Sequence, residues 1–220
     1  SGTAVPLLPG ATARIFLVPA QSVEWVDSWK VIGLNATNSG GFKVDGLFVP
    51  QGYSVCREHI LEVNQPGALY KFPLNSCFAV GFSAVALGIA RAMLDATLAL
   101  ALDKKPRIAK HSLRENHLVQ FHIAEAEARL RSARSFVETT AQRVWDDVIA
   151  TETLSIPQRI DIRMAATFAI LEAATVADVA WDIAGASAIF ASSPLERRLR
   201  DIRTVTQQAQ GRKSHLQDVG

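Results

Sequence analysis

The second half of the chain carries a Ser-x-x-Glu or Ser-x-x-Gln sequence at three places, each where a long segment of helical periodicity begins. In such a capping box, the Ser and the Glu or Gln side chains bond the free backbone N–H groups of a helix's first turn. The boxes start at Ser112, Ser155 and Ser193, and Pro106 ends the periodic segment that precedes the first of them. The predicted helices are 75–104, 112–150, 155–183 and 194–220.

These predicted helices are long, and the segments between them are short. At about 1.5 Å per residue they span about 40–55 Å, and short connections make neighbouring helices antiparallel. Abundant Ala and few aromatic residues, 7% of the chain, also fit closely packed helices. The predicted fold class is therefore mainly α: an antiparallel four-helix bundle over residues 74–220, preceded by the incomplete C-terminal part of a β-domain.

Residues 1–55 have the pattern of β-strands. Short apolar or alternating segments are separated by turn-forming residues, most clearly at 33–41. Three strands do not form a stable sheet with both faces covered. We therefore expect the end of a larger β-domain, joined to the bundle by a linker over residues 56–73. The candidate strands are 13–19, 23–29 and 42–50.

Charge and cysteine content argue against several classes of protein. The 23 basic and 21 acidic residues are spread through the chain, without the basic block or stripe that indicates a nucleic-acid partner. Cys56 and Cys77 form no CxxC motif, and two unpatterned cysteines fit a reducing, cytoplasmic location. The first residues also lack the basic and apolar regions of a signal peptide, so we expect a cytoplasmic protein.

The segment from Cys77 to Leu102 is almost wholly apolar and could be a membrane span or a buried bundle helix. Arg91 and Asp95 lie four residues apart within it. Each charge would cost roughly 2.5–3.5 kcal/mol at the centre of a bilayer, whereas a pair spaced i,i+4 beside water costs little. We therefore expect a bundle helix and no membrane partner.

Metal binding has no support in the sequence. A di-iron bundle needs Glu-x-x-His on two helices, and no Glu in this chain has a His three residues later. Zinc needs clustered Cys and His, but the histidines are scattered. We therefore predict no metal site. The histidines are His59, His111, His117, His122 and His215.

Two clusters near the end of the chain could bind a ligand. The first, 185–190, consists mostly of small residues and precedes the helix predicted from residue 194. Small side chains let a phosphate approach the backbone, and a helix N-terminus attracts it, but the same residues also suit tight helix packing. The second cluster has four Arg within 197–203. These could bind phosphate or nucleic acid, or pair with Glu196 and Asp201.

Several motifs, in order and at similar spacing, resemble acyl-CoA dehydrogenases. Pro194–Asp201 (PLERRLRD) resembles their P-x-E-R-x-x-R-D stretch, and the small residues 185–188 lie where those enzymes carry a Gly-rich turn. Trp29–Pro50 resembles their exit from the β-domain, and Gln120–Leu130 resembles part of their second bundle helix. The resemblance covers nearly all of the chain. Because the small loop reads Gly-Ala-Ser-Ala, it is closest to the type-2 branch, which contains reduced-flavin-dependent monooxygenases.

The resemblance implies a flavin cofactor, FAD or FMN, bound between the β-domain and the bundle of a homo-oligomer, usually a tetramer. In that family an N-terminal helical domain and the first half of the β-domain precede the part resembled here. A separate flavin reductase can supply the reduced flavin. By the same resemblance Ser39 lies near the flavin, and a further set of residues contacts its tail across a subunit boundary: Gln120, Gly185, Ala186, Ser187 and Ala188.

Residues 204–210 depart from the acyl-CoA dehydrogenase pattern. Those enzymes place a carboxylate there to remove a substrate proton, but this stretch is Thr-Val-Thr-Gln-Gln-Ala-Gln. The related monooxygenases often carry a His at the position of Gln208, which is therefore the candidate catalytic residue, although an amide exchanges no proton near pH 7. The predicted function is a flavin-dependent oxidoreductase of monooxygenase or hydroxylase type. Two alternatives stay open: an acyl-CoA dehydrogenase with an atypical base, and a non-catalytic bundle for oligomer assembly.

Overall fold

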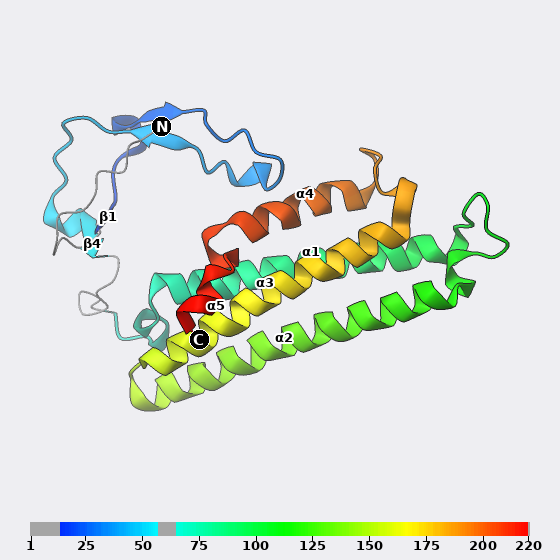
Figure 1. Ribbon diagram of the computed structural model, residues 1–220. Coiled ribbons are helices and arrows are strands. Elements are labelled where there is room, and N and C mark those ends of the chain that lie inside the picture. Colours follow the sequence, from blue (N-terminus) through cyan, green and yellow to red (C-terminus); the bar gives the residue numbers. More distant parts are fainter. Residues whose placement is uncertain (1–13, 57–64, 220) are drawn as a thin grey trace.

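A computed structural model of the chain describes residues 14–56 and 65–219. The fold is mainly α, as predicted: long antiparallel helices lie side by side, a shorter helix packs on them, and the strands lie to one side (Figure 1). The long helices are α1 (Leu74–Asp103), α2 (His117–Thr151) and α3 (Ile156–Ala184). After them come α4 (Pro194–Gln207) and the short α5 (Ser214–Val219).

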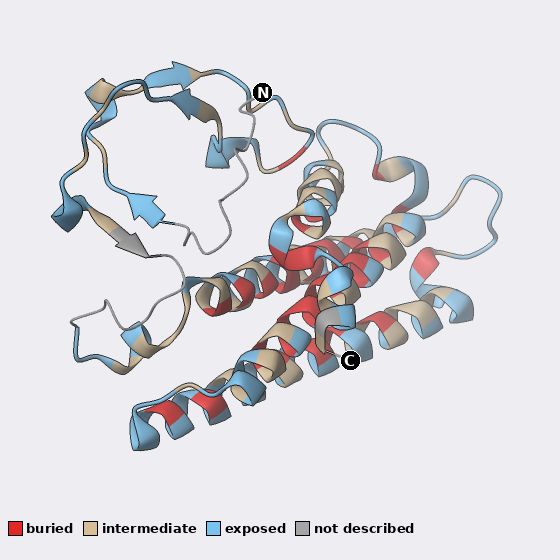
Figure 2. Ribbon diagram, turned by 60° about the vertical axis from the view of Figure 1, so that its left-hand side comes forward, coloured by how far each residue is buried: buried red, intermediate tan, exposed pale blue. Residues whose placement is uncertain are grey.

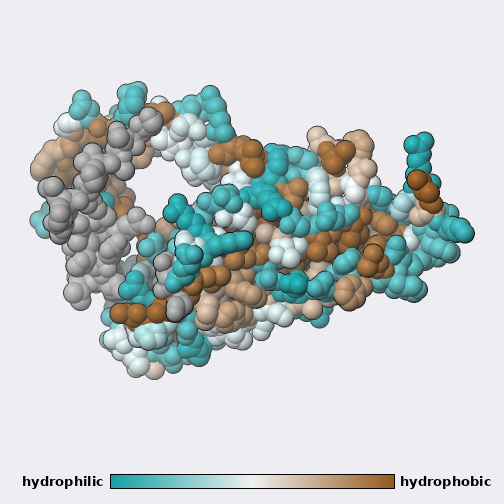
Figure 3. All heavy atoms as spheres, viewed as in Figure 1, coloured by the Kyte–Doolittle hydropathy of each residue, from teal (hydrophilic) through white to brown (hydrophobic). Residues whose placement is uncertain are grey.

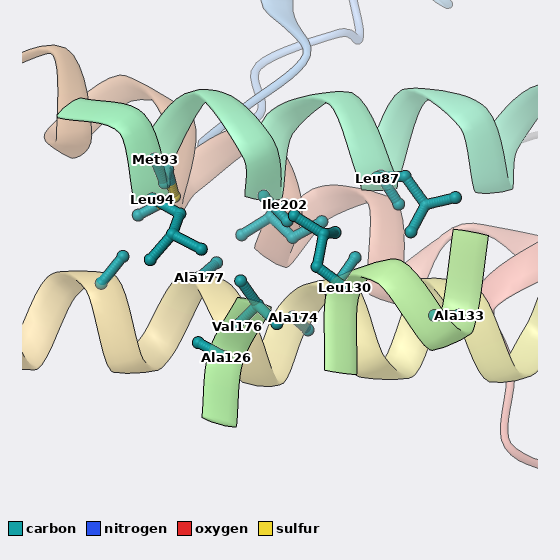
Figure 4. Packing of buried hydrophobic residues seen from close by; sticks show 14 of the residues in the cluster. Leu87, Met93, Leu94, Ala126, Leu130, Ala133, Ala174, Val176, Ala177 and Ile202 are labelled. Carbon is teal, nitrogen blue, oxygen red and sulfur yellow. The ribbon is translucent and has the colours of Figure 1, made fainter. Parts of the chain in front are cut away.

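The core of the bundle is built from alanine and aliphatic side chains. α1 and α3 pack along each other, α2 packs on α3, and α4 lies over both α1 and α3. Met93 and Leu94 of α1 and Ile202 of α4 point into this core, where all are fully buried (Figure 4). Each such side chain stabilises the fold by roughly 1.5–3 kcal/mol. The buried positions follow the inner faces of the helices, so the apolar periodicity decides which faces meet (Figure 2).

Two of the predicted capping boxes form. Ser155 and Gln158 bond each other's backbone N–H groups at the start of α3. Ser112 and Glu115 do the same, but their box caps a single 3-10 turn. Asn116 then caps α2, because its side-chain oxygen accepts from the backbone N–H groups of Leu118 and Val119. The predicted start at 112 is thus a separate turn, and α2 begins five residues later at His117.

The third predicted box, at the start of α4, forms only in part. Ser193 accepts from the N–H of Leu195 at 3.3 Å, so it caps the helix. Glu196 instead accepts from Arg200 one turn later, with contacts of 2.5 and 3.0 Å. A bidentate bond to a guanidinium is stronger than one to a backbone N–H, which explains why Glu196 turns away from the cap.

The last predicted helix, 194–220, is wrong because the chain leaves the helix after Gln207 and forms a turn before α5. Gln208 takes an extended conformation, and its side chain accepts from the N–H of Gln210 at 2.6 Å. At Gly211 an added Cβ would lie 2.8 Å from the carbonyl oxygen of Val205, so this turn requires glycine. A side chain that satisfies the backbone locally competes with the helix, and the close packing of Gly211 on α4 holds the chain in this turn.

The strands differ from the three that were predicted. Within residues 14–56, four strands of three residues form two antiparallel ribbons: β1 (Arg14–Phe16) with β4 (Ser54–Cys56), and β2 (Glu24–Val26) with β3 (Gly41–Lys43). The candidate strand 42–50 is too long: β3 ends at Lys43, and Gly46, with a φ of +59°, breaks the extended run predicted beyond it. Two-stranded ribbons are marginal in water, and the larger β-domain expected around them stays a prediction.

Helices α1 and α3 are each long and apolar enough to cross a membrane by length and composition. Core helices of soluble proteins meet the same criterion, and 56% of the most apolar window of α3 is buried in the bundle, against 39% for α1. Arg91 of α1 also pairs with Asp95 and with Glu127 of α2, at 2.7 and 2.5 Å. These contacts place α1 within the bundle, and the absence of a membrane partner stays a prediction.

Candidate functional site

The small-residue loop predicted to contact a cofactor tail follows the end of α3. Gly185 ends that helix with a φ of +52°, a conformation that favours glycine, and a Cβ there would meet nothing within 4 Å. The N–H of Ala188 donates to the carbonyl of Gly185 at 2.9 Å and closes a tight turn. Ala188 is buried, whereas Gly185 and Ala186 are exposed. The loop is therefore anchored at Ala188, and its backbone around Gly185 is open to a ligand.

A groove of about 390 Å³ lies beside this loop, between α1 and the start of α4. A helix N-terminus carries a partial positive charge, and hydroxyl groups beside it complete the kind of site that binds a phosphate or a sugar. The groove can therefore accept the polar tail of a nucleotide cofactor. Its lining combines apolar side chains, serine hydroxyls and the first residues of α4: Ala96, Leu100, Ser187, Phe190, Ser192, Ser193, Pro194 and Leu195.

Gln120 lies in the first turn of α2, at the same end of the bundle as this loop (Figure 1). Its side-chain NH2 group donates to the carbonyl of Arg114 at 2.6 Å, and its oxygen lies 3.4 Å from Nδ1 of His117. The residue is exposed but is not among those that line the groove. These contacts fix the connection between α1 and α2, and a role for Gln120 at a cofactor stays a prediction.

Ser39 lies in the exposed loop that leads into β3. Its hydroxyl donates to the hydroxyl of Thr37 at 3.1 Å, and Thr37 donates to the carbonyl of Leu34 at 2.9 Å. The indole N–H of Trp29 reaches the same carbonyl at 3.2 Å. A short chain of hydrogen bonds therefore holds the Ser39 loop on the segment around Leu34.

That segment is clamped to α4. The guanidinium of Arg200 donates to the carbonyl of Ile32 at 2.7 Å, and the carboxylate of Asp201 accepts from the N–H of Leu34 at 2.7 Å. Between these contacts, Gly33 is buried directly against the helix backbone: an added Cβ would lie 2.3 Å from the carbonyl oxygen of Arg200. Two of the motifs on which the resemblance rests, one in the β-part and one in α4, thus meet in space.

Two of the four arginines in the α4 cluster, Arg200 and Arg203, form ion pairs, which is one of the two outcomes left open. Arg200 pairs with Glu196. The hydrogen bonds between them lower the pKa of the Glu196 carboxyl below its usual value and raise the pKa of the Arg200 guanidinium. Arg203 pairs with Asp178 of α3. The cluster therefore joins α4 to its neighbours: Arg203 connects it to α3, and Arg200 connects it to the β-part.

Gln208 is the residue at which the chain leaves α4. Its N–H donates to the carbonyls of Thr204 and Val205 at 3.2 Å, and its side-chain oxygen accepts from the N–H of Gln210 at 2.6 Å. A backbone N–H only donates, so this contact assigns the amide oxygen to the side that faces Gln210. The NH2 group is then the part that can meet a ligand. Gln208 therefore offers a hydrogen-bond donor at a half-buried position.

Helix α4 separates these features within one chain. Its 14 residues span about 21 Å at about 1.5 Å per residue, with the groove at its N-terminus and Gln208 at its C-terminus. The clamp holds the segment that carries the Ser39 loop against the middle of the helix, at Arg200 and Asp201. A single chain does not bring Gln208 and the 185–188 loop together, so their contact with one flavin stays a prediction.

Sequence reasoning missed Gly33, Gln210 and Arg163. Gly33 stands among other turn residues, and nothing local indicates that it packs against a helix far along the chain. Gln210 is one of several glutamines in a polar stretch, yet it is the one that is buried, where it accepts from Arg163. A polar residue directly before a glycine was the available signal, because glycine often marks a turn.

Residues 80–212, more than half of the chain, match the family described as "Acyl-CoA dehydrogenase, C-terminal domain". The chain belongs to this family. In this acyl-CoA dehydrogenase domain, residues 204–210 carry no carboxylate, and Gln208 offers a donor. Over the described residues, no group of three His, Cys, Asp or Glu side chains could hold a metal ion.

Relatives named as monooxygenases match most of the chain. It is 31% identical to indole-3-acetate monooxygenase of Pseudomonas putida, over 89% of this chain and 50% of that protein. It is 24% identical to the flavin-dependent monooxygenase oxygenase subunit HsaA of Rhodococcus jostii, over 84% of this chain and 50% of that protein. The chain thus spans about half the length of the relatives that it matches.

Solved structures share the fold. XiaF from Streptomyces sp., in complex with FADH2 and glycerol, superposes with a TM-score of 0.85 at 21% identity, over 95% of this chain and 54% of that one. TdsC from Paenibacillus sp. A11-2, with FMN and indole, superposes with a TM-score of 0.74 at 20% identity, over 93% of this chain and 53% of that one. At these identities the likeness establishes the fold.

Proposed function

We propose that the complete protein is a flavin-dependent monooxygenase that inserts one oxygen atom of O2 into an aromatic substrate. The observation that carries the proposal is the donor at Gln208, in a stretch with no carboxylate, within an acyl-CoA dehydrogenase fold. Dehydrogenation of an acyl-CoA needs a base there, whereas oxygen transfer does not. The names of the relatives, an indole-3-acetate monooxygenase and a flavin-dependent oxygenase subunit, favour the same reaction.

The cofactor we propose is FAD or FMN, delivered in reduced form by a separate reductase. When bound, it supplies two electrons and two protons, so that one oxygen atom of O2 enters the product and the other leaves as water. The open backbone at Gly185 and the hydroxyls of Ser187 and Ser193 fit its phosphate-bearing tail. The described residues supply this end of the site, and its ring would be held elsewhere, beside the β-part.

We propose that Gln208 orients an oxygen atom of the substrate or cofactor by donating a hydrogen bond. An amide does not take up a proton near neutral pH, so Gln208 acts by position and polarity. The clamp at Gly33 holds the Ser39 loop at a fixed distance from it. Gln208 and the Ser39 loop are then held in place before a substrate binds, and such preorganisation lowers the entropic cost of orienting the reactants.

The proposed assembly is a homo-oligomer, with four copies as in the resembled family. The outward side of α1 is apolar: Phe78, Val85 and Leu102 are all exposed. An added Cβ at Gly81 or Gly88 would meet nothing within 4 Å. Hydrophobic residues also reach the bundle surface seen in Figure 3. Such a stripe fits burial against a second copy. Light scattering of the complete protein tests this, and a monomer would contradict it.

The activity is tested by mixing the complete protein with chemically reduced FAD or FMN and air-saturated buffer containing indole or a phenol. The expected result is a hydroxylated product formed in step with O2 consumption. The matched assay gives acyl-CoA thioesters and an artificial electron acceptor to the flavin-bound protein. Bleaching of bound flavin by a thioester, without oxygen transfer, would replace the proposal by a dehydrogenase. No reaction in either assay would favour a bundle that serves assembly.

A further inference from the structure

The turn after α4 is tied to the bundle by a buried glutamine. Gln210 is only 5% exposed, and its side-chain oxygen accepts a hydrogen bond from the guanidinium of Arg163 on α3. Helix α3 packs against α1, α2 and α4, so it is a rigid support for this contact. Buried glutamine side chains are uncommon unless they are bonded, and this one connects the turn to the central helix.

The backbone of Gln210 donates in turn to the side-chain oxygen of Gln208 at 2.6 Å. A chain of contacts therefore runs from Arg163, through Gln210, to the carboxamide of Gln208. We infer that Arg163 is a positioning residue, which acts through Gln210 to set the direction in which the Gln208 NH2 group points. The inference rests on the proposed function, in which that group donates to an oxygen atom at the reacting centre.

Two further contacts hold the turn in other ways. Nε2 of His215 on α5 donates to the carbonyl of Ala209 at 2.6 Å, and the N–H of Gly211 donates to the carbonyl of Gln208 at 2.9 Å. These bonds fix the backbone of the turn, whereas the contact with Arg163 is made by the side chain of Gln210. Loss of the Arg163 contact should therefore loosen the orientation of the turn without unfolding it.

Gln210 is the better position for a test, since Arg163 has interactions besides this one. Gln210→Leu removes the acceptor, and Gln210→Glu keeps it and adds a charge opposite to that of Arg163. Arg159→Gln is the matched control, because Arg159 is an exposed arginine one turn earlier on α3. Gln208→Ala gives the full effect of losing the donor.

The first measurement is amide hydrogen exchange over residues 208–211 in the complete protein without flavin. A lost hydrogen bond to a charged group should speed exchange there by about tenfold or more in Gln210→Leu. Exchange in Gln210→Glu and Arg159→Gln should match the wild type. Unchanged exchange in Gln210→Leu would overturn the inference, whatever the protein catalyses.

The second measurement is the amount of hydroxylated product per O2 consumed, with chemically reduced flavin, at a temperature where circular dichroism shows every variant folded. Gln210→Leu should lower this ratio to within about twofold of Gln208→Ala, with the Kd for flavin unchanged, while Gln210→Glu should retain it. A ratio in Gln210→Leu equal to wild type, beside a low ratio in Gln208→Ala, would overturn the inference alone. A wild-type protein that forms no product would overturn the proposed function, and with it the role of Gln208.

Discussion

Replacement of Gly33 by alanine should separate the β-part from the bundle. The added Cβ would lie 2.3 Å from the carbonyl oxygen of Arg200 and 2.7 Å from the nitrogen of Asp201, both backbone atoms of α4. Backbone within a packed helix cannot shift as the end of a flexible side chain can. The segment must therefore move outward, which stretches the contacts that join Ile32 to Arg200 and Leu34 to Asp201.

The expected cost comes from two sources. Overpacking at a tight site costs typically about 1–3 kcal/mol. Weakening a hydrogen bond to a charged group, such as that between Leu34 and Asp201, costs about 1.5–3 kcal/mol when it is lost outright. Outward movement of the segment relieves the overpacking but weakens the hydrogen bond, so the two costs do not add in full. We expect the free energy of unfolding to fall by about 3 kcal/mol in total. For a domain of this size that corresponds to a fall in Tm of about 6–12 °C.

Differential scanning calorimetry of the complete protein measures this fall directly. Gly52→Ala is the matched control, because Gly52 lies in the same β-part and an added Cβ there meets nothing within 4 Å. The control should melt within about 1 °C of the wild type, since surface substitutions away from special features usually cost under about 0.5 kcal/mol. A Tm of Gly33→Ala equal to that of Gly52→Ala would refute the clamp.

Two further predictions concern a charge and the proposed donor. Hydrogen bonds from Arg91 and Arg131 hold the pKa of Glu127 below its usual value of 4.5, so its stabilising contribution is complete above that value and disappears as pH falls through the lowered pKa. Urea unfolding should therefore show Glu127→Gln to be less stable than wild type by up to about 1 kcal/mol at pH 7. This difference in stability should disappear below the lowered pKa, and a difference that persists there would contradict the pairing. Gln208→His should make hydroxylation depend on pH with a midpoint near about 6.5, whereas the wild-type rate should show no such step when the two are compared between pH 5 and 8.

The helices of the bundle were predictable because their signals are local. A capping side chain, a proline and an apolar periodicity act within a few residues, so the expected segment 155–183 differs by one residue at each end from α3, which runs from Ile156 to Ala184. The start of α2 was missed because Ser112 forms a genuine box on a separate turn, and Asn116 caps the helix after it.

The end of α4 and the strands were not predictable in this way. Glutamine and alanine are good helix formers, and the break at Gln208 depends on the packing of Gly211 against α4 and of Gln210 against α3. The expected strand at 42–50 was interrupted by Gly46, whose positive φ the alternation of apolar residues did not reveal. In both cases tertiary contacts or one backbone angle override the local preference.

The candidate site was predictable in residue type more than in arrangement. The resemblance pointed to the 185–188 loop and to Gln208, but the separation of these along α4 comes only from the structure. The clamp could not be predicted because its partners are far apart in the sequence: Arg200 follows Gly33 by 167 positions. A sequence pattern does not state which distant segments meet, and here that meeting sets the relation between the Ser39 loop and α4.

The most direct test of the proposed monooxygenase uses isotopic oxygen. The complete protein, chemically reduced FAD or FMN and an indole or phenol substrate are mixed with 18O2, and the product is analysed by mass spectrometry. The account predicts one 18O atom in each product molecule and none when 16O2 is used with 18O-labelled water. Product that takes its oxygen from water, or an acyl-CoA that is dehydrogenated while the aromatic substrate stays unchanged, would contradict it.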